Sequence, residues 1–267
     1  MKETIGFIGA GKMGSALVKG LLAAKAVDPR RIIVSDASGG KAAALAKELG
    51  VKAAGNNNEV LQKSDVVLVC VKPQAVPAVL EEIAGRAAGK LVISIAAGVS
   101  ISFVEAKLPG ARVARVMPNA PCLVGEGASA YALGKTAGEK DAAVVECLFG
   151  SVGKIVRVKE ELLDAVTALS GCGPAYFYEA VGALAEAGER AGLPKDIALE
   201  LAAQTCLGAG KMVEKTGLPP KELISQVATP GGATEAGMKE LKSAKFREAL
   251  AKAFEAAARR AAELGIK

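Results

Sequence analysis

The sequence predicts an α/β fold, a mostly parallel and doubly wound sheet, followed by an all-α domain. Three observations carry this prediction. Short β-branched runs alternate with amphipathic segments up to about residue 160, the strand pattern then stops, and the first expected strand leads into a glycine-rich loop. We therefore place an α/β domain at residues 1–160 and a helical domain at residues 161–267.

The expected strands are runs of four to six residues that are nearly all apolar. Such runs, separated by helices, are typical of a parallel sheet that is covered on both faces. The expected strands are Thr4–Ile8, Arg31–Ser35, Val66–Val71, Leu91–Ser94, Arg112–Met117 and Ala128–Leu133. The amphipathic segments between them include Ser15–Ala24, Gly40–Leu49 and Ala75–Ala84.

The second half is expected to be helical throughout. Proline and glycine separate its segments at Pro174, Gly192–Pro194 and Gly217–Pro220. The expected helices are Glu161–Leu169, Ala175–Ala191, Lys195–Lys215, Pro220–Val227 and Ala236–Leu264, the last with a break near Ser243. The stretch Leu199–Gly210 carries a single charge, so this helix needs cover that a small helical domain does not supply. We therefore expect an obligate homodimer built on the second half.

The composition excludes several classes of site. The chain has no histidine, which removes the commonest general base and metal ligand. Five scattered cysteines without a C-x-x-C pair argue against a metal site and a disulfide framework, and favour a reducing, cytoplasmic compartment. The N-terminus leads directly into an expected strand, so we expect no signal peptide, and no apolar run suits a membrane span.

The net charge of +6 is concentrated in residues 1–160. Its Lys and Arg residues are dispersed, and aromatic residues are not interleaved with them, so we do not expect a nucleic-acid partner. An anionic cofactor held by the first domain accounts for this charge better.

The first expected strand is followed by a complete G-x-G-x-x-G motif and then a helix. In this context the motif predicts a Rossmann dinucleotide site: Gly9 permits a tight turn, Gly11 lets a pyrophosphate approach, and Gly14 allows close helix–strand packing. The N–H groups at the helix start would bind the phosphates. The alternative is an ordinary turn between strand and helix. The candidate residues are Gly9, Ala10, Gly11, Lys12, Met13 and Gly14.

Asp36 follows the second expected strand and is suited to bind the adenosine ribose hydroxyls. Its charge repels a 2′-phosphate, which favours NADH over NADPH. Ser38 and Lys41 lie nearby and could still meet a phosphate, and Asp36 could instead be a solvated loop carboxylate.

Two further strand ends are expected to line the same crevice, since loops at the carboxyl ends of parallel strands do so. They are Val71-Lys72-Pro73 and Ala96-Ala97-Gly98, and the small residues of the second would let a flat ring lie against the backbone. For Lys72 alone, a surface lysine is an equally good interpretation.

These motifs, in this order, resemble those of the pyrroline-5-carboxylate reductase family. Two stretches of the second half make the resemblance specific: LSGCGPAY at residues 169–176 and VATPGGATEAGMKEL at residues 227–241. The resemblance covers the whole chain and implies reduction of the cyclic imine 1-pyrroline-5-carboxylate to L-proline with NAD(P)H. It also implies dimers, which can associate further into rings.

The resemblance also assigns roles to individual residues. It implies that Thr234 hydrogen-bonds the ring nitrogen, that Gly231, Gly232 and Ala233 hold the substrate carboxylate, and that Asn57 touches the cofactor. The remaining substrate-binding candidates are Ser170, Gln226 and Thr229. The chain departs from the family pattern at Cys172, where many members have Ser, at Ala228-Thr229, where many have Thr-Ser, and at Gly217–Pro220, where many carry an acidic residue and a His-Pro pair.

Residues 230–235 have a physical interpretation of their own. Pro230 fixes the entry to the segment, Gly231-Gly232 free the backbone, and Thr234 is expected to cap a helix that starts at Glu235. The expected product is a carboxylate receptor at a helix N-terminus. The alternative is a simple turn with an ordinary cap.

Hydride attack on a protonated imine needs orientation and an electrophile but no strong base, which agrees with the absence of histidine. Two other functions remain open from the residues alone. A β-hydroxyacid dehydrogenase would need a catalytic lysine, for which Lys195 and Lys211 are the candidates, although neither follows a glycine-rich turn. A non-catalytic dinucleotide sensor would bind NAD(P)H without oxidising it.

Overall fold

The computed structural model describes residues 2–265 of the chain. It forms two compact units, Met1–Cys172 together with Ala257–Lys267, and Gly173–Ala256. The backbone therefore divides at Cys172, whereas the functional boundary expected at residue 160 stays a prediction. The expected end of the second domain, residue 267, lies outside the described residues.

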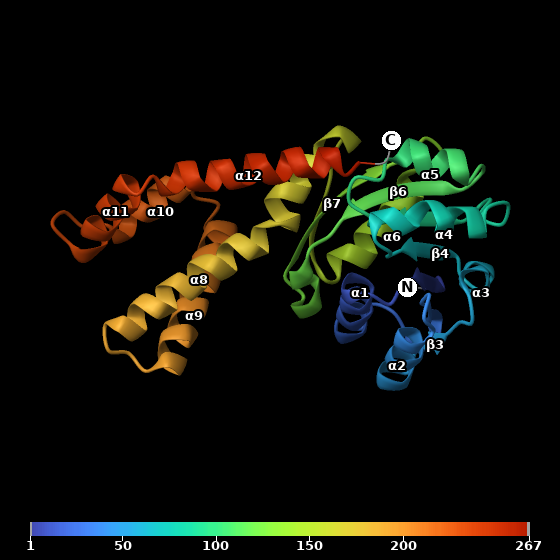
Figure 1. The fold of residues 1–267 in the computed structure, drawn as a ribbon, viewed down its shortest axis with the longest axis horizontal. Helices are drawn as coiled ribbons and strands as arrows, with labels where there is room; N and C mark the ends of the chain where they lie inside the picture. The colour runs from blue at the N-terminus through green and yellow to red at the C-terminus, as the bar shows by residue number, and fades with distance from the viewer. Residues whose placement is uncertain (1, 266–267) are drawn as a thin grey trace. The chain divides into compact units, whose positions relative to one another are not determined.

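The first unit is built on an eight-stranded sheet with the order β3-β2-β1-β4-β5-β6-β7-β8 (Figure 1). The strands from β3 to β6 are parallel, β7 runs antiparallel to β6, and β8 is parallel to β7. This confirms the α/β class and the mostly parallel sheet. The strands are β1 (Ile5–Ile8), β2 (Ile32–Ser35), β3 (Lys52–Ala53), β4 (Val66–Val69), β5 (Leu91–Ser94), β6 (Arg112–Met117), β7 (Gly127–Leu133) and β8 (Gly153–Arg157).

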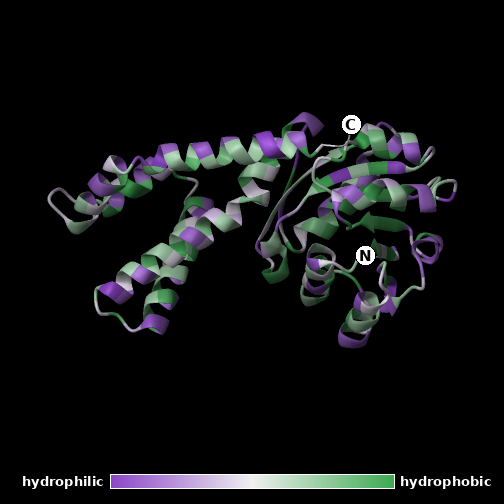
Figure 2. Cartoon of the chain, in the orientation of Figure 1, coloured by the Kyte–Doolittle hydropathy of each residue, from purple (hydrophilic) through white to green (hydrophobic). Residues whose placement is uncertain are grey.

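Each face of the sheet has its own apolar core, because successive side chains of a strand point to opposite faces. Phe7 packs into the core under α1 (Lys12–Ala23), α2 (Gly40–Leu49) and α6 (Glu139–Gly150). Ile8 packs into the opposite core. The helices that cover this second core are α3 (Asn57–Gln62), α4 (Val76–Ile83), α5 (Ile101–Lys107) and α7 (Leu163–Val166). The strands are accordingly hydrophobic along most of their length (Figure 2).

Several short elements of the first unit were not expected from the sequence. The edge strands β3 and β8 are largely exposed and carry charged residues, so neither shows a continuous apolar run. Helices were expected between the strands, but α3, α5 and α6 were not named individually. The remaining short turns are the 3-10 helices η1 (Pro29–Arg31), η2 (Pro73–Ala75), η3 (Ala120–Val124) and η4 (Glu160–Leu162), and the π-helical turn η5 (Thr167–Gly171).

The second unit is helical, and no strand is described after Arg157. Its helices are α8 (Gly173–Arg190), α9 (Lys195–Thr216), α10 (Pro220–Val227), α11 (Ala233–Ser243) and the first part of α12 (Phe246–Glu263). The expected break near Ser243 is confirmed, because Ala244 and Lys245 separate α11 from α12 and Lys245 adopts a left-handed φ of 54°. No helix among residues 2–265 is long and apolar enough to cross a membrane.

The second unit buries little of its apolar surface on its own. Its buried cluster consists of Ala185, Ala198 and Ala202, with Val181 packed against it. On α9, Leu199 is 52% exposed and Leu201 is 53% exposed. An apolar surface of this kind is typical of a face that another chain covers.

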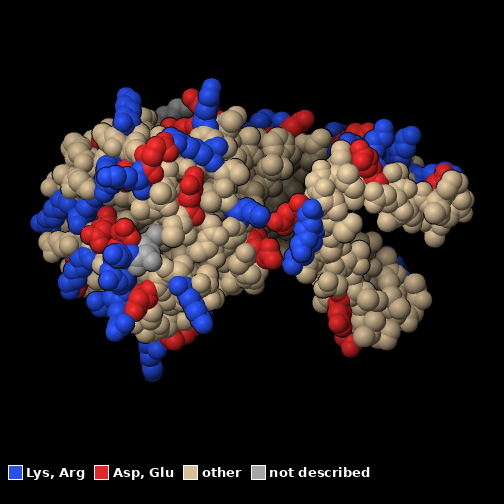
Figure 3. All heavy atoms as spheres, turned by 180° about the vertical axis from the view of Figure 1, so that it is seen from behind, with Lys and Arg blue, Asp and Glu red and all other residues tan. Residues whose placement is uncertain are grey.

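Charged side chains are distributed differently from apolar ones. On the face shown in Figure 3, Lys and Arg side chains are spread over the first unit with Asp and Glu side chains between them. This agrees with the dispersed basic residues of the sequence and shows no continuous basic stripe on that face of the unit.

Candidate cofactor and substrate site

The candidate cofactor crevice lies at the carboxyl ends of the central strands. The chain passes from β1 outward to β2 and β3 and then returns to β4 on the other side of β1, which is the point where a doubly wound sheet opens a ligand crevice. Two hydrogen bonds join the loops there: Gly9 N–H donates to Ser35 O (2.9 Å), and Cys70 N–H donates to Ile8 O (2.8 Å).

The glycine loop has the geometry that a pyrophosphate requires. Gly9 has a φ of 111°, a left-handed value that favours glycine. A Cβ on Gly14 would lie 2.2 Å from Gly9 O, so α1 packs against the loop as only glycine permits. A Cβ on Gly11 would meet no atom within 4 Å, which leaves the space above the loop open. The N–H groups of the first turn of α1, which starts at Lys12, face no helical acceptor. These residues fit a dinucleotide phosphate.

Two side chains stabilise this loop from below. Ser15 Oγ donates to Ala10 O at 3.1 Å, which ties the first turn of α1 to the loop. The Cys70 side chain packs against Gly14 while its carbonyl lies against Gly9, and burial raises the pKa of its thiol well above its usual range. Cys70 is therefore a protonated packing group. Sequence analysis did not single out either residue.

Asp36 and Asn57 lie on the β2 side of this edge. Asp36 is half-buried after β2, and its carboxylate accepts from the backbone N–H and the hydroxyl of Ser38. Ser35 Oγ donates to Asn57 Oδ1 (2.7 Å), and Asn57 Nδ2 donates to Glu82 Oε2 (2.6 Å). This network brings Asn57 beside the strand that presents Asp36.

The loops after β4 and β5 line the same edge. Val71 is half-buried, Lys72 is exposed, and Pro73 starts η2. In the loop after β5, Ala96 is buried and Ala97 is half-buried. These loops thus supply small or partly exposed groups at the carboxyl ends of neighbouring strands.

Gly98 ends the second of these loops in contact with the last described part of the chain. It has a φ of 75°, and a Cβ placed on it would lie 2.9 Å from the Cα of Gly265. A Cβ on Gly265 would in turn lie 3.3 Å from Gly98 O. Glycine at both positions lets the end of α12 pass close to the loop.

A cavity of about 300 Å³ lies beside Gly98 in the same unit, and sequence analysis did not predict it. Its main polar group is Arg115, whose side chain is only 9% exposed. Arg115 pairs with Glu160 (3.3 Å) and Asp164 (3.1 Å), and Glu160 also accepts from the N–H of Ile101 (2.7 Å). The sequence did contain one signal for this cavity, since Arg115 lies in the middle of the expected buried strand Arg112–Met117.

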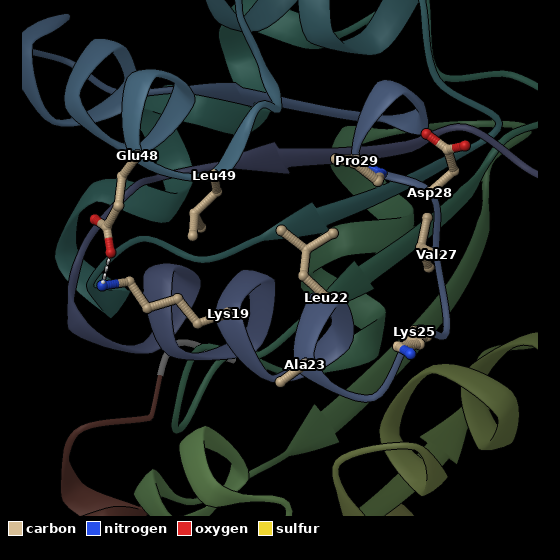
Figure 4. Close-up of a pocket in the computed structure, with 9 residues that line it drawn as sticks. All are labelled: Lys19, Leu22, Ala23, Lys25, Val27, Asp28, Pro29, Glu48 and Leu49. Atoms are coloured by element: carbon tan, nitrogen blue, oxygen red, sulfur yellow. Dashed lines mark ion pairs between the residues drawn. The ribbon is translucent and has the colours of Figure 1, made fainter.

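A second, open hollow of about 810 Å³ lies at the opposite ends of the strands (Figure 4). It is formed where α1 and α2 end and β2 begins, and the ion pair between Lys19 and Glu48 (2.7 Å) crosses its side. Because it faces away from the glycine loop, we do not assign the cofactor to it.

The candidate substrate loop belongs to the second unit, and one expectation about it is wrong. The helix α11 starts at Ala233 with Gly232 as its N-cap residue, so Thr234 lies in the first turn and is not the cap. Gly231 takes the left-handed conformation (φ 73°), and its N–H donates to Glu235 Oε2 at 2.7 Å. Two glycines let the chain enter the helix two residues earlier than a cap at Thr234 would.

This correction leaves the Thr234 hydroxyl available to a ligand. Thr234 is exposed, and its hydroxyl makes no hydrogen bond to the described residues of the chain. The N–H groups of the first turn of α11 remain suited to a carboxylate. Gln226 lies in the last turn of α10, Thr229 follows that helix, and both are exposed. Ser170 instead lies in the first unit.

Comparisons with known proteins agree along the whole chain. Residues 160–264 match the family model "pyrroline-5-carboxylate reductase dimerisation", and residues 4–98 match "NADP oxidoreductase coenzyme F420-dependent". The chain is 44% identical to pyrroline-5-carboxylate reductase of Arabidopsis thaliana over 97% of this chain and 95% of that protein.

Two solved structures are similar over nearly their full length. A pyrroline-5-carboxylate reductase from Coxiella burnetii has a TM-score of 0.92 at 36% identity and covers 100% of both chains. The Plasmodium falciparum pyrroline carboxylate reductase, solved with NADP bound, has a TM-score of 0.91 at 33% identity and covers 99% of both chains.

The open space above Gly11 generates a prediction. We expect Gly11→Val to abolish cofactor binding in calorimetry with NADH while the melting temperature stays near that of the wild type, because the new side chain fills only the space of the ligand. As a matched control, Gly14→Val should lower the melting temperature strongly, since its Cβ would collide with Gly9 O. Unchanged NADH affinity in Gly11→Val would refute the assignment of the loop.

Proposed function

This chain belongs to the pyrroline-5-carboxylate reductase family, and from that membership we infer that it reduces the cyclic imine 1-pyrroline-5-carboxylate to L-proline with NAD(P)H. The observation that carries this function is full-length similarity to enzymes of that name, over both the glycine-loop unit and the helical unit. The direct test mixes the protein with NADH or NADPH and the imine and follows the loss of reduced nicotinamide by absorbance.

The chain's own residues contribute binding and orientation to this reaction. The dinucleotide, when bound, supplies the hydride for the imine carbon. We propose that Gly9–Gly14 hold its phosphates at the start of α1, that Asp36 and Asn57 meet its adenosine half, and that residues 71–73 and 96–98 line the rest. Orientation of this kind corresponds to effective molarities worth about 7–11 kcal/mol.

The substrate's carboxylate and nitrogen are assigned to the second unit. We propose that Gly231, Gly232 and Ala233 present backbone N–H groups to the carboxylate, as a helix N-terminus does. Thr234 is proposed to hydrogen-bond the ring nitrogen, which arrives protonated and becomes a secondary amine when the carbon accepts the hydride. Ser170, Gln226 and Thr229 complete the proposed contacts.

Membership of this family argues against the two alternative functions, a β-hydroxyacid dehydrogenase and a non-catalytic sensor. A β-hydroxyacid dehydrogenase would need a catalytic lysine, but no step of imine reduction requires Lys195 or Lys211, which both lie on α9. A sensor without catalysis would differ from enzymes that the chain matches over nearly its full length. The reducing, cytoplasmic compartment stays a prediction.

Cofactor preference depends on Asp36. We expect NADH to serve at least as well as NADPH, and Asp36→Ser to lower the KM for NADPH more than the KM for NADH, because it removes a charge that repels a 2′-phosphate. Lys41→Ala is the control: if Lys41 binds the phosphate, only the NADPH kinetics should weaken. A wild-type kcat/KM about tenfold or more in favour of NADPH would contradict this prediction.

We propose that the second unit forms a homodimer and that dimers can associate into rings. The exposed apolar side chains of α9, together with the match to a dimerisation model, support the dimer. Light scattering at micromolar concentration should give at least twice the mass of the chain, and Leu201→Glu should shift the equilibrium toward monomer because it places a charge on this apolar face. A stable wild-type monomer would rule out the dimer.

Thr234 provides a test of the substrate site. We expect Thr234→Ala to lower kcat/KM for the imine by about 10- to 100-fold, the range given by one lost hydrogen bond and one unpaired polar group. Because Gly232 and not Thr234 caps α11, the melting temperature should not change.

Thr234→Ser keeps the hydroxyl and should stay near wild type in the same assay. If the alanine variant reduces the imine as fast as the wild type, Thr234 has no contact with the reacting nitrogen. Complete loss of activity would instead indicate a proton donor, a role for which a threonine hydroxyl is poorly suited at neutral pH.

A further inference from the structure

Asn119 connects two segments of the first unit that are far apart in sequence. It lies two residues after the end of β6 and is only 6% exposed. Its Oδ1 accepts from Ala128 N–H at 2.9 Å, and its Nδ2 donates to Ser170 O at 3.0 Å. One buried amide therefore joins the start of β7 to the π-helical turn η5.

The Ser170 carbonyl needs this donor for a reason that the sequence contains. In a regular α-helix the carbonyl of residue 170 would accept from the N–H of residue 174, but residue 174 is proline and has no N–H. The helix widens into a π turn instead, in which Cys172 N–H donates to Thr167 O at 2.8 Å. The Asn119 amide supplies the donor that the Ser170 carbonyl lacks.

A second contact presses the same turn against the end of β6. A Cβ on Gly171 would lie 2.6 Å from the terminal methyl of Met117, so the backbone of the turn rests directly on that side chain. Met117 is the last residue of β6 and Asn119 is two residues further along. The turn is thus held at adjacent points by the carboxyl end of one strand.

Because the turn is held by the carboxyl end of β6, it lies at the edge of the sheet where the cofactor is proposed to bind. Asp36 follows β2 and the glycine loop follows β1, so the proposed dinucleotide runs along the edge from β2 across β1 toward β4, β5 and β6. Its nicotinamide half therefore lies toward the β5 and β6 side of the sheet. The turn that contains Ser170 lies at that end of the first unit's crevice.

We propose that Asn119 is a positioning residue for imine reduction, which holds the Ser170–Cys172 turn at the nicotinamide end of the crevice. The proposal rests on the proposed function. Asn119 acts through the turn, without touching the substrate, and sets the distance between the turn's substrate contacts and the nicotinamide. A reaction that depends on orientation is sensitive to such a displacement.

The test uses the full-length protein. Asn119→Asp keeps the size of the side chain and the acceptor for Ala128 N–H, but it replaces the donor to Ser170 O with an oxygen. We expect kcat for 1-pyrroline-5-carboxylate to fall about 10- to 100-fold, while the calorimetric Kd for NADH stays within about twofold of wild type.

Tyr131→Phe is the matched control, because it also removes one buried side-chain hydrogen bond in the same unit. Tyr131 OH donates to Glu146 Oε1 at 2.6 Å. Tyr131 belongs to the core under α1, α2 and α6, whereas Met117, which contacts the turn, packs against the opposite core. The control should lower the melting temperature with kcat unchanged. If Asn119→Asp likewise lowers only the melting temperature, Asn119 is merely structural and the proposal fails.

Gly171→Ala tests the turn without removing any hydrogen bond. Its methyl would displace the turn from Met117 and should reproduce the fall in kcat with unchanged NADH affinity, even if Asn119→Asp does not fold. A wild-type kcat in Gly171→Ala, or an equal loss of NADH affinity in either variant, overturns the proposal. A wild-type protein that oxidises no NADH with this imine overturns the proposed function itself, which distinguishes the two failures.

Discussion

The close approach of α1 to the ends of β1 and β4 is the constraint on which the first unit's site depends. Gly14 lies so close to Gly9 O that no larger residue fits, and Cys70 fills the space beneath both glycines. This packing aims the N-terminus of α1 along the carboxyl edge of the sheet, where the loops after β2, β4 and β5 meet it. The direction of the helix N–H groups, and with it the location of an anionic ligand, follows from that contact.

Sequence patterns predicted the helices and strands that a run of neighbouring residues is enough to define. Buried parallel strands such as β5 and β6 appear as apolar runs, and both were predicted with the bounds observed. The edge strand β8 escaped prediction because Lys154 and Arg157 interrupt its apolar residues, and the exposed β3 has no apolar run at all. The helix α3 has a local start signal, since the Asn56 side chain accepts from Glu59 N–H, but its 6 residues are too few to show an apolar periodicity.

The candidate site was predicted in part for the same reason. The glycine loop has a local signature with one geometric meaning, so its residues could be placed from sequence. The N-cap of α11 was predicted at Thr234 but lies at Gly232. The glycines at 231 and 232 allow this earlier start, because Gly232 adopts the extended backbone conformation of an N-cap residue. Asn119 carried no local signal, since its role depends on a carbonyl that lies far along the chain.

The contact between Gly98 and Gly265 has a consequence for how the protein is made. The first unit is discontinuous, since it is completed by the end of α12 after the whole helical unit has been synthesised. Domains generally fold from the N-terminus as the chain leaves the ribosome. Here the sheet can form early, but the loop at Gly98 stays uncovered until Gly265 has been synthesised. This edge of the sheet therefore acquires its native neighbour only after the whole helical unit has left the ribosome.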